Sequence, residues 1–184
     1  MRLRFNEAKA TQAAARLLQL QGASMSYLKL IKLLYILDRE ALLRWGRPVT
    51  TDRYVSMDRG PVVSKIYDLI VDELLSGDRS LWREHISEPQ NYSVRLLKEA
   101  GADELSRIEE ELIDEVVSTH GAKSPWELVN YSHTFLEWQD PKGSAIPIEY
   151  RDILRAGGKT ETEIAAIEAE LESIAATEAL VAPG

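Results

Sequence analysis

Few side chains in this sequence stand at spacings that support catalysis. The 184 residues contain no cysteine and three histidines, His85, His120 and His133. Cysteine-based zinc and iron–sulfur sites are therefore excluded, and no two histidines have the i, i+4 spacing of a helical metal site. His133 stands near Glu137 and Trp138, which allows an acid–base pair, although a core histidine bonded to backbone is the commoner arrangement. We expect no catalytic residue, no metal and no cofactor.

One carboxylate is unusual because of its position. In the stretch "SYLKLIKLLYILDREALLRWG", apolar residues cover one broad face at helical spacing, and Asp38 projects into the middle of that face. A buried carboxylate needs hydrogen-bond donors or takes a raised pKa. No second acidic residue stands at a catalytic spacing. We therefore expect Asp38 to be buried and bonded to nearby backbone, tyrosine or arginine, with a role as an acid or ligand as the alternative.

The elements that must position these residues are mostly helices. One helix is predicted from Asn6 to Gln21, and the stretch containing Asp38 forms a second, central helix that ends at Gly46. A later helix from Asp103 to Gly121 is expected to bury four residues, and the capping box Ser124–Glu127 starts another. Those four residues are Leu105, Ile108, Leu112 and Val116. A short helix is predicted over 148–155.

Two stretches indicate a little β structure. Tyr92, Val94 and Leu96 alternate as in a strand, which we expect to pair with 85–87 across the turn at Pro89. In "YVSMDRGPVVSKIYDLI" an extended segment precedes Gly60 and Pro61, which are expected to form an ordered joint leading into a helix. The helical face would hold Val62, Val63, Ile66, Tyr67, Ile70 and Leu74.

Charge is divided unevenly along the chain, which has a net charge of −8. Residues 1–65 hold 12 Lys/Arg and 5 Asp/Glu, a net of +7, whereas residues 66–184 hold 10 and 25, a net of −15. The acidic part argues against general binding to nucleic acid, and the basic part leaves room for one local patch. The sequence has no long apolar run, so we expect no membrane span and a cytoplasmic protein.

The C-terminal segment has its own pattern. Gly157 and Gly158 are a predicted hinge, which divides the chain into 1–156 and an extension, 157–184. The extension carries an acidic helix with a narrow apolar seam formed by Ile164, Ile167, Leu171 and Ile174. Such a seam must cover its own domain, a second copy of the chain or another protein.

Three stretches, taken in order, resemble the signatures of the SocA-like antitoxins, also called the Panacea domain. They are "LKLIKLLYILDREALLRWGRPV", "YVSMDRGPVVSKIYDLI" and "THGAKSPWELVNYSHTFLEW". The chain departs from the pattern at Glu137, where proline is usual, and at Ile31, where glutamine is common. We expect most of the matching residues to determine the fold. They are Lys29, Lys32, Leu33, Leu34, Tyr35, Gly60, Pro61, Tyr67, His133 and Trp138.

The resemblance implies a compact, mainly α domain with a short β-hairpin, acting without catalysis. It also implies an antitoxin of a type II toxin–antitoxin system that binds a protein toxin encoded by the adjacent gene. A proteolytic adaptor that delivers the toxin to a protease is one alternative. A DNA-binding autoregulator that uses the basic first 65 residues is the other, although nucleic acid is the less expected partner. A complex with more than one copy of this chain remains open.

The C-terminal helix is a predicted part of the toxin-binding surface. Its seam of four large apolar residues is wide enough to anchor a helix in a groove, and glutamates such as Glu163 and Glu170 would complement a basic toxin surface. The alternative is that the helix covers the core of its own domain.

Overall fold

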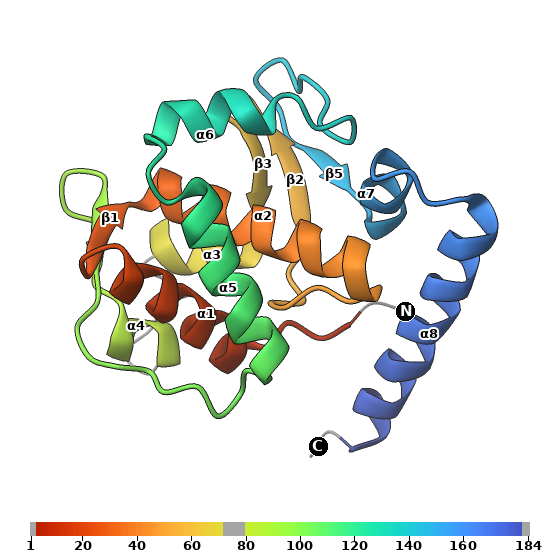
Figure 1. Ribbon diagram of the computed structural model, residues 1–184, viewed down its shortest axis with the longest axis horizontal. Coiled ribbons are helices and arrows are strands. Elements are labelled where there is room, and N and C mark those ends of the chain that lie inside the picture. Colours follow the sequence, from red (N-terminus) through yellow and green to blue (C-terminus); the bar gives the residue numbers. More distant parts are fainter. Residues whose placement is uncertain (1–2, 72–79, 182–184) are drawn as a thin grey trace.

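Helix α2 runs through the middle of the molecule, and most other elements pack around it (Figure 1). The computed structural model describes residues 3–71 and 80–181. Within these ranges the fold is mainly α with minor β, as the sequence predicts. The helices are α1 (Glu7–Leu20), α2 (Tyr27–Trp45), α3 (Ser64–Val71), α4 (Leu81–His85), α5 (Arg107–His120), α6 (Pro125–Ser132), α7 (Tyr150–Ala156) and α8 (Glu161–Val181). The strands are β1 (Ser24–Ser26), β2 (Tyr54–Met57), β3 (Gly60–Val63), β4 (Ser93–Arg95) and β5 (Ile146–Ile148).

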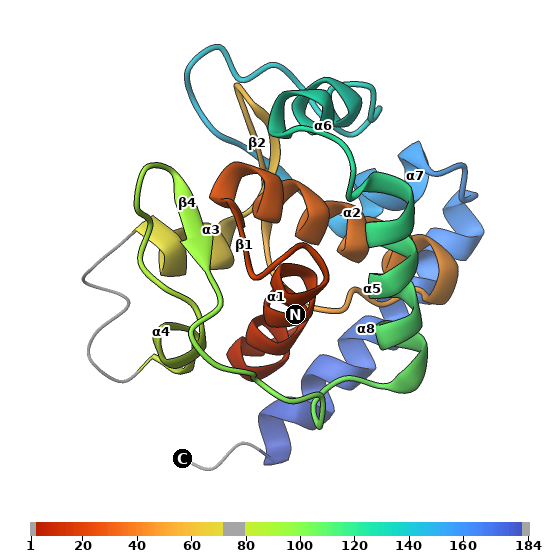
Figure 2. The same cartoon turned by 60° about the vertical axis from the view of Figure 1, so that its left-hand side comes forward.

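The core is built on α2 because that helix is apolar around most of its circumference. Leu30, Leu33, Leu34 and Leu37 are fully buried, and α1, α5, α6, α7 and β3 all contact the helix. Gly46 ends the helix in the left-handed conformation at φ 72°, as expected from its place after the apolar run. Figure 2 shows α1 and α5 beside α2 from a second direction.

Helix α1 presents small side chains to the core. The Asn6 side chain accepts a hydrogen bond from the backbone N–H of Lys9 at 3.0 Å and caps the helix, as predicted. Ala10, Ala13 and Ala14 are fully buried. Because alanine adds little bulk, α1 approaches α2 and α5 closely.

In the part of the chain that the structure describes, two small antiparallel sheets accompany the helices, and their pairing differs from the prediction. Strand β4 pairs with β1, whose strand character the sequence did not reveal, in the register Met25 to Val94. The expected hairpin across Pro89 is reduced to isolated bridges, one of which joins Ile86 and Leu96. The second sheet has the order β3-β2-β5. Its hairpin is β2–β3, with a tight turn at Asp58 and Arg59.

The joint predicted at Gly60 and Pro61 is wrong in detail, because these residues belong to strand β3. Val62 and Val63 continue the strand, and helix α3 begins only at Ser64. The strand is favoured because Gly60 adopts a φ of 92° after the turn and Pro61 is tolerated on an edge strand. Leu74, which was placed on the same helical face, lies outside the described residues.

Two helix predictions also need correction. Helix α5 begins at Arg107, not at Asp103, because the capping box Ser106–Glu109 sets its start, and Ile108 is 51% exposed rather than buried. The helix predicted from Ile148 begins at Tyr150. Ile148 itself ends strand β5, where it pairs with Tyr54 of β2.

Helix α8 lies against its own domain along one side of the molecule (Figure 1). Its seam residues Ile164 and Leu171 are buried, whereas Ile167 and Ile174 are half-buried against the core. Glu163 and Glu170 are exposed on its outer side. The domain's own core therefore covers the seam, which was the alternative to a partner. The toxin-binding role of these six residues and the division of the chain at residue 156 stay predictions.

Candidate functional site

Four polar residues on α2 repeat every third position and each holds a different part of the chain. Lys29 donates to the carbonyl of Gly121 at 2.6 Å, and Lys32 donates to the carbonyl of Pro61 at the same distance. The hydroxyl of Tyr35 donates to Glu137 at 3.0 Å. Asp38, the fourth, binds the loop that follows α2. Leu33 and Leu34 of the same signature are fully buried. The role of these residues as fold determinants stays a prediction.

Asp38 is fully buried and is surrounded by donors from one loop. Its Oδ1 accepts from the backbone N–H groups of Val49 and Thr50 at 2.9 and 2.8 Å. Its Oδ2 accepts from the hydroxyls of Thr50 and Tyr54. Burial raises the pKa of Asp38 to about 6, against the opposing effect of these hydrogen bonds. The carboxylate anchors residues 49–54 against α2 and has no open side for a substrate to approach.

A second buried carboxylate, Asp52, was not identified from the sequence. Its oxygens accept from the backbone N–H groups of Arg53 at 2.6 Å, Lys65 at 2.8 Å and Ile66 at 3.0 Å. Asp52 therefore caps the first turn of α3 from a distant point of the chain. Burial raises its pKa to about 7. Because the capped helix starts more than ten residues later, no local capping motif signals this role.

The possible acid–base pair of His133 and Glu137 is not formed. The ring of His133 stacks on Trp138 with centroids 4.1 Å apart, and its Nε2 lies 3.1 Å from the carbonyl oxygen of Asp58. The indole of Trp138 donates to the carbonyl of Met57 at 3.0 Å. Glu137 instead accepts from Tyr35 and pairs with Arg39 at 2.7 Å. Histidine and tryptophan thus hold the β2–β3 turn, and the glutamate binds α2.

Gly60 is required at its position for two separate reasons. Its φ of 92° is unfavourable for other residues, and a Cβ there would lie 2.3 Å from Oγ of Ser132 and 3.2 Å from Nζ of Lys32. We expect Gly60→Ala to lower the free energy of unfolding by about 3 kcal/mol, measured by urea denaturation.

Gly143→Ala is the matched control for this prediction. Gly143 has a similar φ of 82°, but nothing lies within 4 Å of the position that its Cβ would take. The control variant therefore has the backbone strain without the close contact. We expect it to lower the free energy of unfolding by about 1 kcal/mol. Equal losses for the two variants would show that the approach of Ser132 is unimportant.

A groove of about 620 Å³ lies where α2 begins, between the β2–β3 turn, the start of α6 and the loop that carries Tyr92. We call it the aromatic groove. Tyr92 and Trp126 are 75% and 56% exposed, and the guanidinium of Arg59 lies 5.2 Å from the centroid of the Trp126 ring. Its apolar lining is Tyr27, Leu28, Ile31, Met57, Val62, Tyr67, Tyr92, Pro125 and Trp126. Its charged lining is Lys32, Asp58 and Arg59.

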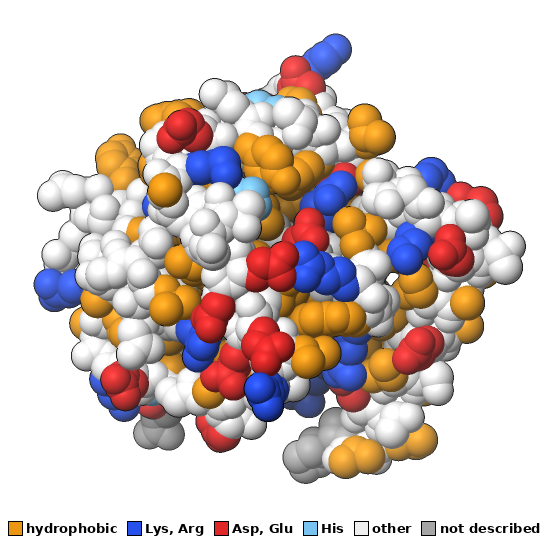
Figure 3. Space-filling view, viewed as in Figure 1, with side chains coloured by type: hydrophobic (Ala, Val, Ile, Leu, Met, Phe, Trp, Pro, Cys, Tyr) orange, Lys and Arg blue, Asp and Glu red, His pale blue; other side chains and the backbone are white. Residues whose placement is uncertain are grey.

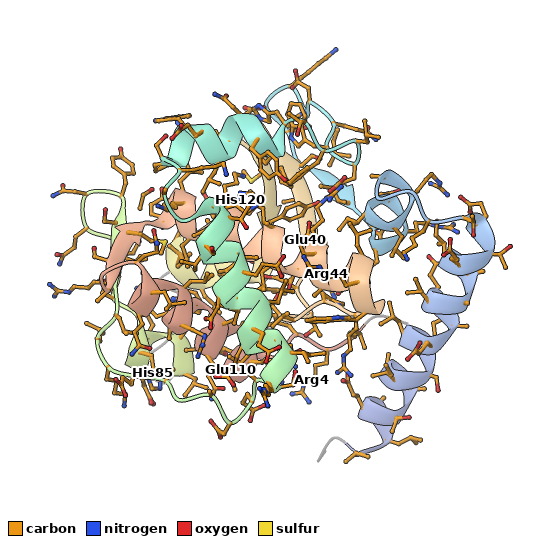
Figure 4. All side chains as sticks on the ribbon, viewed as in Figure 1. Arg4, Glu40, Arg44, His85, Glu110 and His120 are labelled. Atoms are coloured by element: carbon orange, nitrogen blue, oxygen red, sulfur yellow. The ribbon has the colours of Figure 1, made fainter. Side chains whose placement is uncertain are left out.

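The histidines do not converge on one point. His85 lies at α4 and His120 at the end of α5, well apart in Figure 4. Among residues 3–71 and 80–181, no three His, Asp or Glu side chains gather in a way that could hold a metal ion. In the same part of the chain, no helix is long and apolar enough to cross a membrane.

Basic side chains of the first 65 residues pair with acidic side chains of the rest of the chain. Figure 3 shows the two signs of charge side by side over α5 and the adjoining part of α2, where Figure 4 labels Glu40 and Arg44. The uneven charge of the sequence is thereby balanced between packed elements. The pairs and their N–O distances are Lys9–Glu109 (2.7 Å), Arg16–Asp114 (2.9 Å), Arg39–Glu137 (2.7 Å), Arg44–Glu115 (2.7 Å) and Arg47–Glu178 (3.8 Å).

Comparison with known proteins gives one match. No curated protein and no solved structure matches the chain. The model of the family described as "Antitoxin SocA-like, Panacea domain" matches residues 30–139. This range covers more than half of the chain and includes most of α2, the β2–β3 hairpin, α6 and the residues up to Trp138 that hold the hairpin's turn. The chain belongs to the SocA-like antitoxin family and carries its Panacea domain.

Proposed function

We propose that this protein is an antitoxin that neutralises a protein toxin by direct, non-catalytic binding in the cytoplasm. The family match over residues 30–139 carries the proposal. The chemistry of the described residues supports it, because the polar signature residues are used in internal contacts. Lys29, Tyr35 and His133 each bind another part of the same chain. Glu137, which departs from the signature, is held by two partners.

The ion pairs argue against the alternative of a DNA-binding autoregulator. Binding to the phosphate backbone depends on Lys and Arg side chains that are free to contact it. Arg16, Arg39 and Arg44 are each paired at 2.9 Å or less with carboxylates from the acidic part of the chain. We therefore favour a protein partner over nucleic acid. A gel-shift with the promoter of the chain's own operon, repeated across salt concentrations, separates the two.

Co-expression with the product of the adjacent gene tests the proposed function. We expect that product alone to arrest growth, and we expect this chain to restore growth and to co-purify with it as a stable complex. A variant with Leu136→Ala is a useful control, because Leu136 is 82% exposed and lies outside the aromatic groove. A harmless neighbour, or rescue without any complex, would contradict neutralisation by direct binding.

A further inference from the structure

Lys32 is the unusual feature of the aromatic groove. The residue is fully buried, yet it lines the groove, and its ammonium group has three N–H donors. Across residues 3–71 and 80–181, the carbonyl of Pro61 is its one hydrogen-bond acceptor, and no carboxylate pairs with it. Burial lowers the pKa of Lys32 to about 7. A buried cation without a counter-ion is costly, so an anion that enters the groove gains from pairing with it.

The walls around Lys32 have the composition of a protein-binding surface. Tyrosine, tryptophan and arginine are the residues that most often dominate binding energy at interfaces. Tyr92 and Trp126 are exposed, and Tyr27 also lines the groove, with its ring centroid 6.3 Å from that of Tyr92. Arg59 is held over Trp126. A side chain that enters the groove toward Lys32 would therefore lie between large aromatic side chains.

The charge of the groove suits a single carboxylate. Arg59 offsets Asp58, whose Oδ1 already accepts from the backbone N–H of Gly143 at 3.0 Å. Lys32, which is partly protonated near pH 7, makes the lining positive in a protein of net charge −8. A phosphate group fits less well. The start of α6 borders the groove, but Pro125 has no N–H and the N–H of Glu127 is engaged by Ser124 in the capping box, which also places the carboxylate of Glu127 nearby.

We propose that the aromatic groove is the docking site for an acidic side chain of the bound toxin, whose carboxylate pairs with the ammonium of Lys32 while its flanking residues pack on Tyr92 and Trp126. This inference rests on the proposed antitoxin function. It gives the signature residues Lys32 and Tyr67 a place in partner binding beside their place in the fold.

The first test measures the affinity of the purified toxin for single variants of this chain by titration calorimetry. Tyr92→Ala, Trp126→Ala and Lys32→Met are each expected to weaken binding at least tenfold. Leu136→Ala removes an equally exposed apolar side chain outside the groove and is expected to change the affinity less than twofold. Circular dichroism melting checks that each variant remains folded.

The second test identifies the carboxylate on the toxin. Each exposed Asp or Glu of the toxin is replaced by its amide. One replacement is expected to weaken binding to the wild-type chain at least tenfold and to have little further effect on Lys32→Met. Should Lys32→Met not fold, the same cycle is run with Trp126→Ala, because the two contacts belong to one docked segment and their effects should be less than additive.

Three outcomes separate this inference from the proposed function. If Tyr92→Ala and Trp126→Ala bind the toxin with unchanged affinity, or if no amide replacement in the toxin weakens binding, the groove is not the docking site. The proposed antitoxin function is unaffected by this outcome. Binding of ATP that is lost in Lys32→Met would assign the groove to nucleotides and overturn the inference as well. Failure of the wild-type chain to bind the toxin refutes the proposed function itself.

Discussion

Asp38→Ala is expected to lower the free energy of unfolding by about 3 kcal/mol or more at neutral pH. The carboxylate is fully buried and accepts from two backbone N–H groups and two hydroxyls, all from residues 49–54. Alanine leaves these buried donors without an acceptor and opens a cavity beside them. Urea denaturation at pH 7 measures the loss. A loss below about 1 kcal/mol would show that the loop finds other acceptors.

Asp38→Asn is the matched control, and its pH dependence distinguishes a buried charge from a packing effect. The amide oxygen can still accept from Val49 and Thr50, so Asn should cost less than Ala. In the wild type the folded pKa of Asp38 is about 6, above the ordinary value of 3.8. The folded state therefore binds this proton more tightly. The part of the stability that depends on this proton is full below pH 3.8 and is lost as the pH rises through 6, whereas the hydrogen bonds that the carboxylate accepts remain at pH 7.

The difference in unfolding free energy between the wild type and Asp38→Asn should therefore change by about 3 kcal/mol between pH 3.5 and pH 7, in favour of Asn at the higher pH. Asp52, whose pKa is raised by burial and to a lesser degree by the charge of Asp38, adds a slope of the same sign to both proteins, and this slope is smaller in Asp38→Asn. A difference that does not vary with pH would show that Asp38 titrates at its ordinary pKa in the folded protein.

Ile164→Asp is expected to undock helix α8 or to unfold the protein. Ile164 is fully buried in the seam, and Leu171 is 7% exposed, so the two together contribute roughly 4 kcal/mol of apolar burial. Aspartate removes half of that contribution and adds a buried charge without a partner. We expect a loss of about 4 kcal/mol in unfolding free energy, or the appearance of protease cleavage confined to residues 157–181.

Ala165→Asp is the control for this prediction, because it introduces the same carboxylate one residue further along, at an exposed position. Its effect should stay within about 0.5 kcal/mol. If Ile164→Asp and Ala165→Asp change the free energy of unfolding equally, the seam does not pack on the domain. If Ile164→Asp leaves a folded domain with a detached helix, its affinity for the toxin also tests the proposed role of α8 in binding.

The starts of α1 and α6 and the end of α2 were predictable because their signals are local. Asn6 accepts from Lys9 and Ser124 pairs with Glu127 three residues away, so one turn of sequence contains the whole motif. The burial of Asp38 was predictable for a similar reason, since helical periodicity alone places it on an apolar face. The Panacea signatures were recognisable because the spacing of their residues follows from the helices and the hairpin that carry them.

Strand pairing was decided by the tertiary structure. Gly60 and Pro61 form an edge strand because β2 is available to pair with it and because Lys32 of α2 satisfies the Pro61 carbonyl. In the same way, Ser24–Ser26 becomes a strand only beside β4, which lies far along the chain. Hydrogen bonds of a sheet join distant residues, so the local sequence does not contain their partners.

The sequence by itself therefore determined most of the long helices, the caps at Asn6 and Ser124 and the family, because each depends on neighbouring residues or on their spacing. Only the tertiary structure decided what covers the seam of α8, which carboxylate caps α3, and that Lys32, Tyr92 and Trp126 line one groove. These features unite residues from separate segments, and their energies arise from burial and from charges brought together by packing. No local pattern encodes such contacts, since they exist only once the core around α2 has formed.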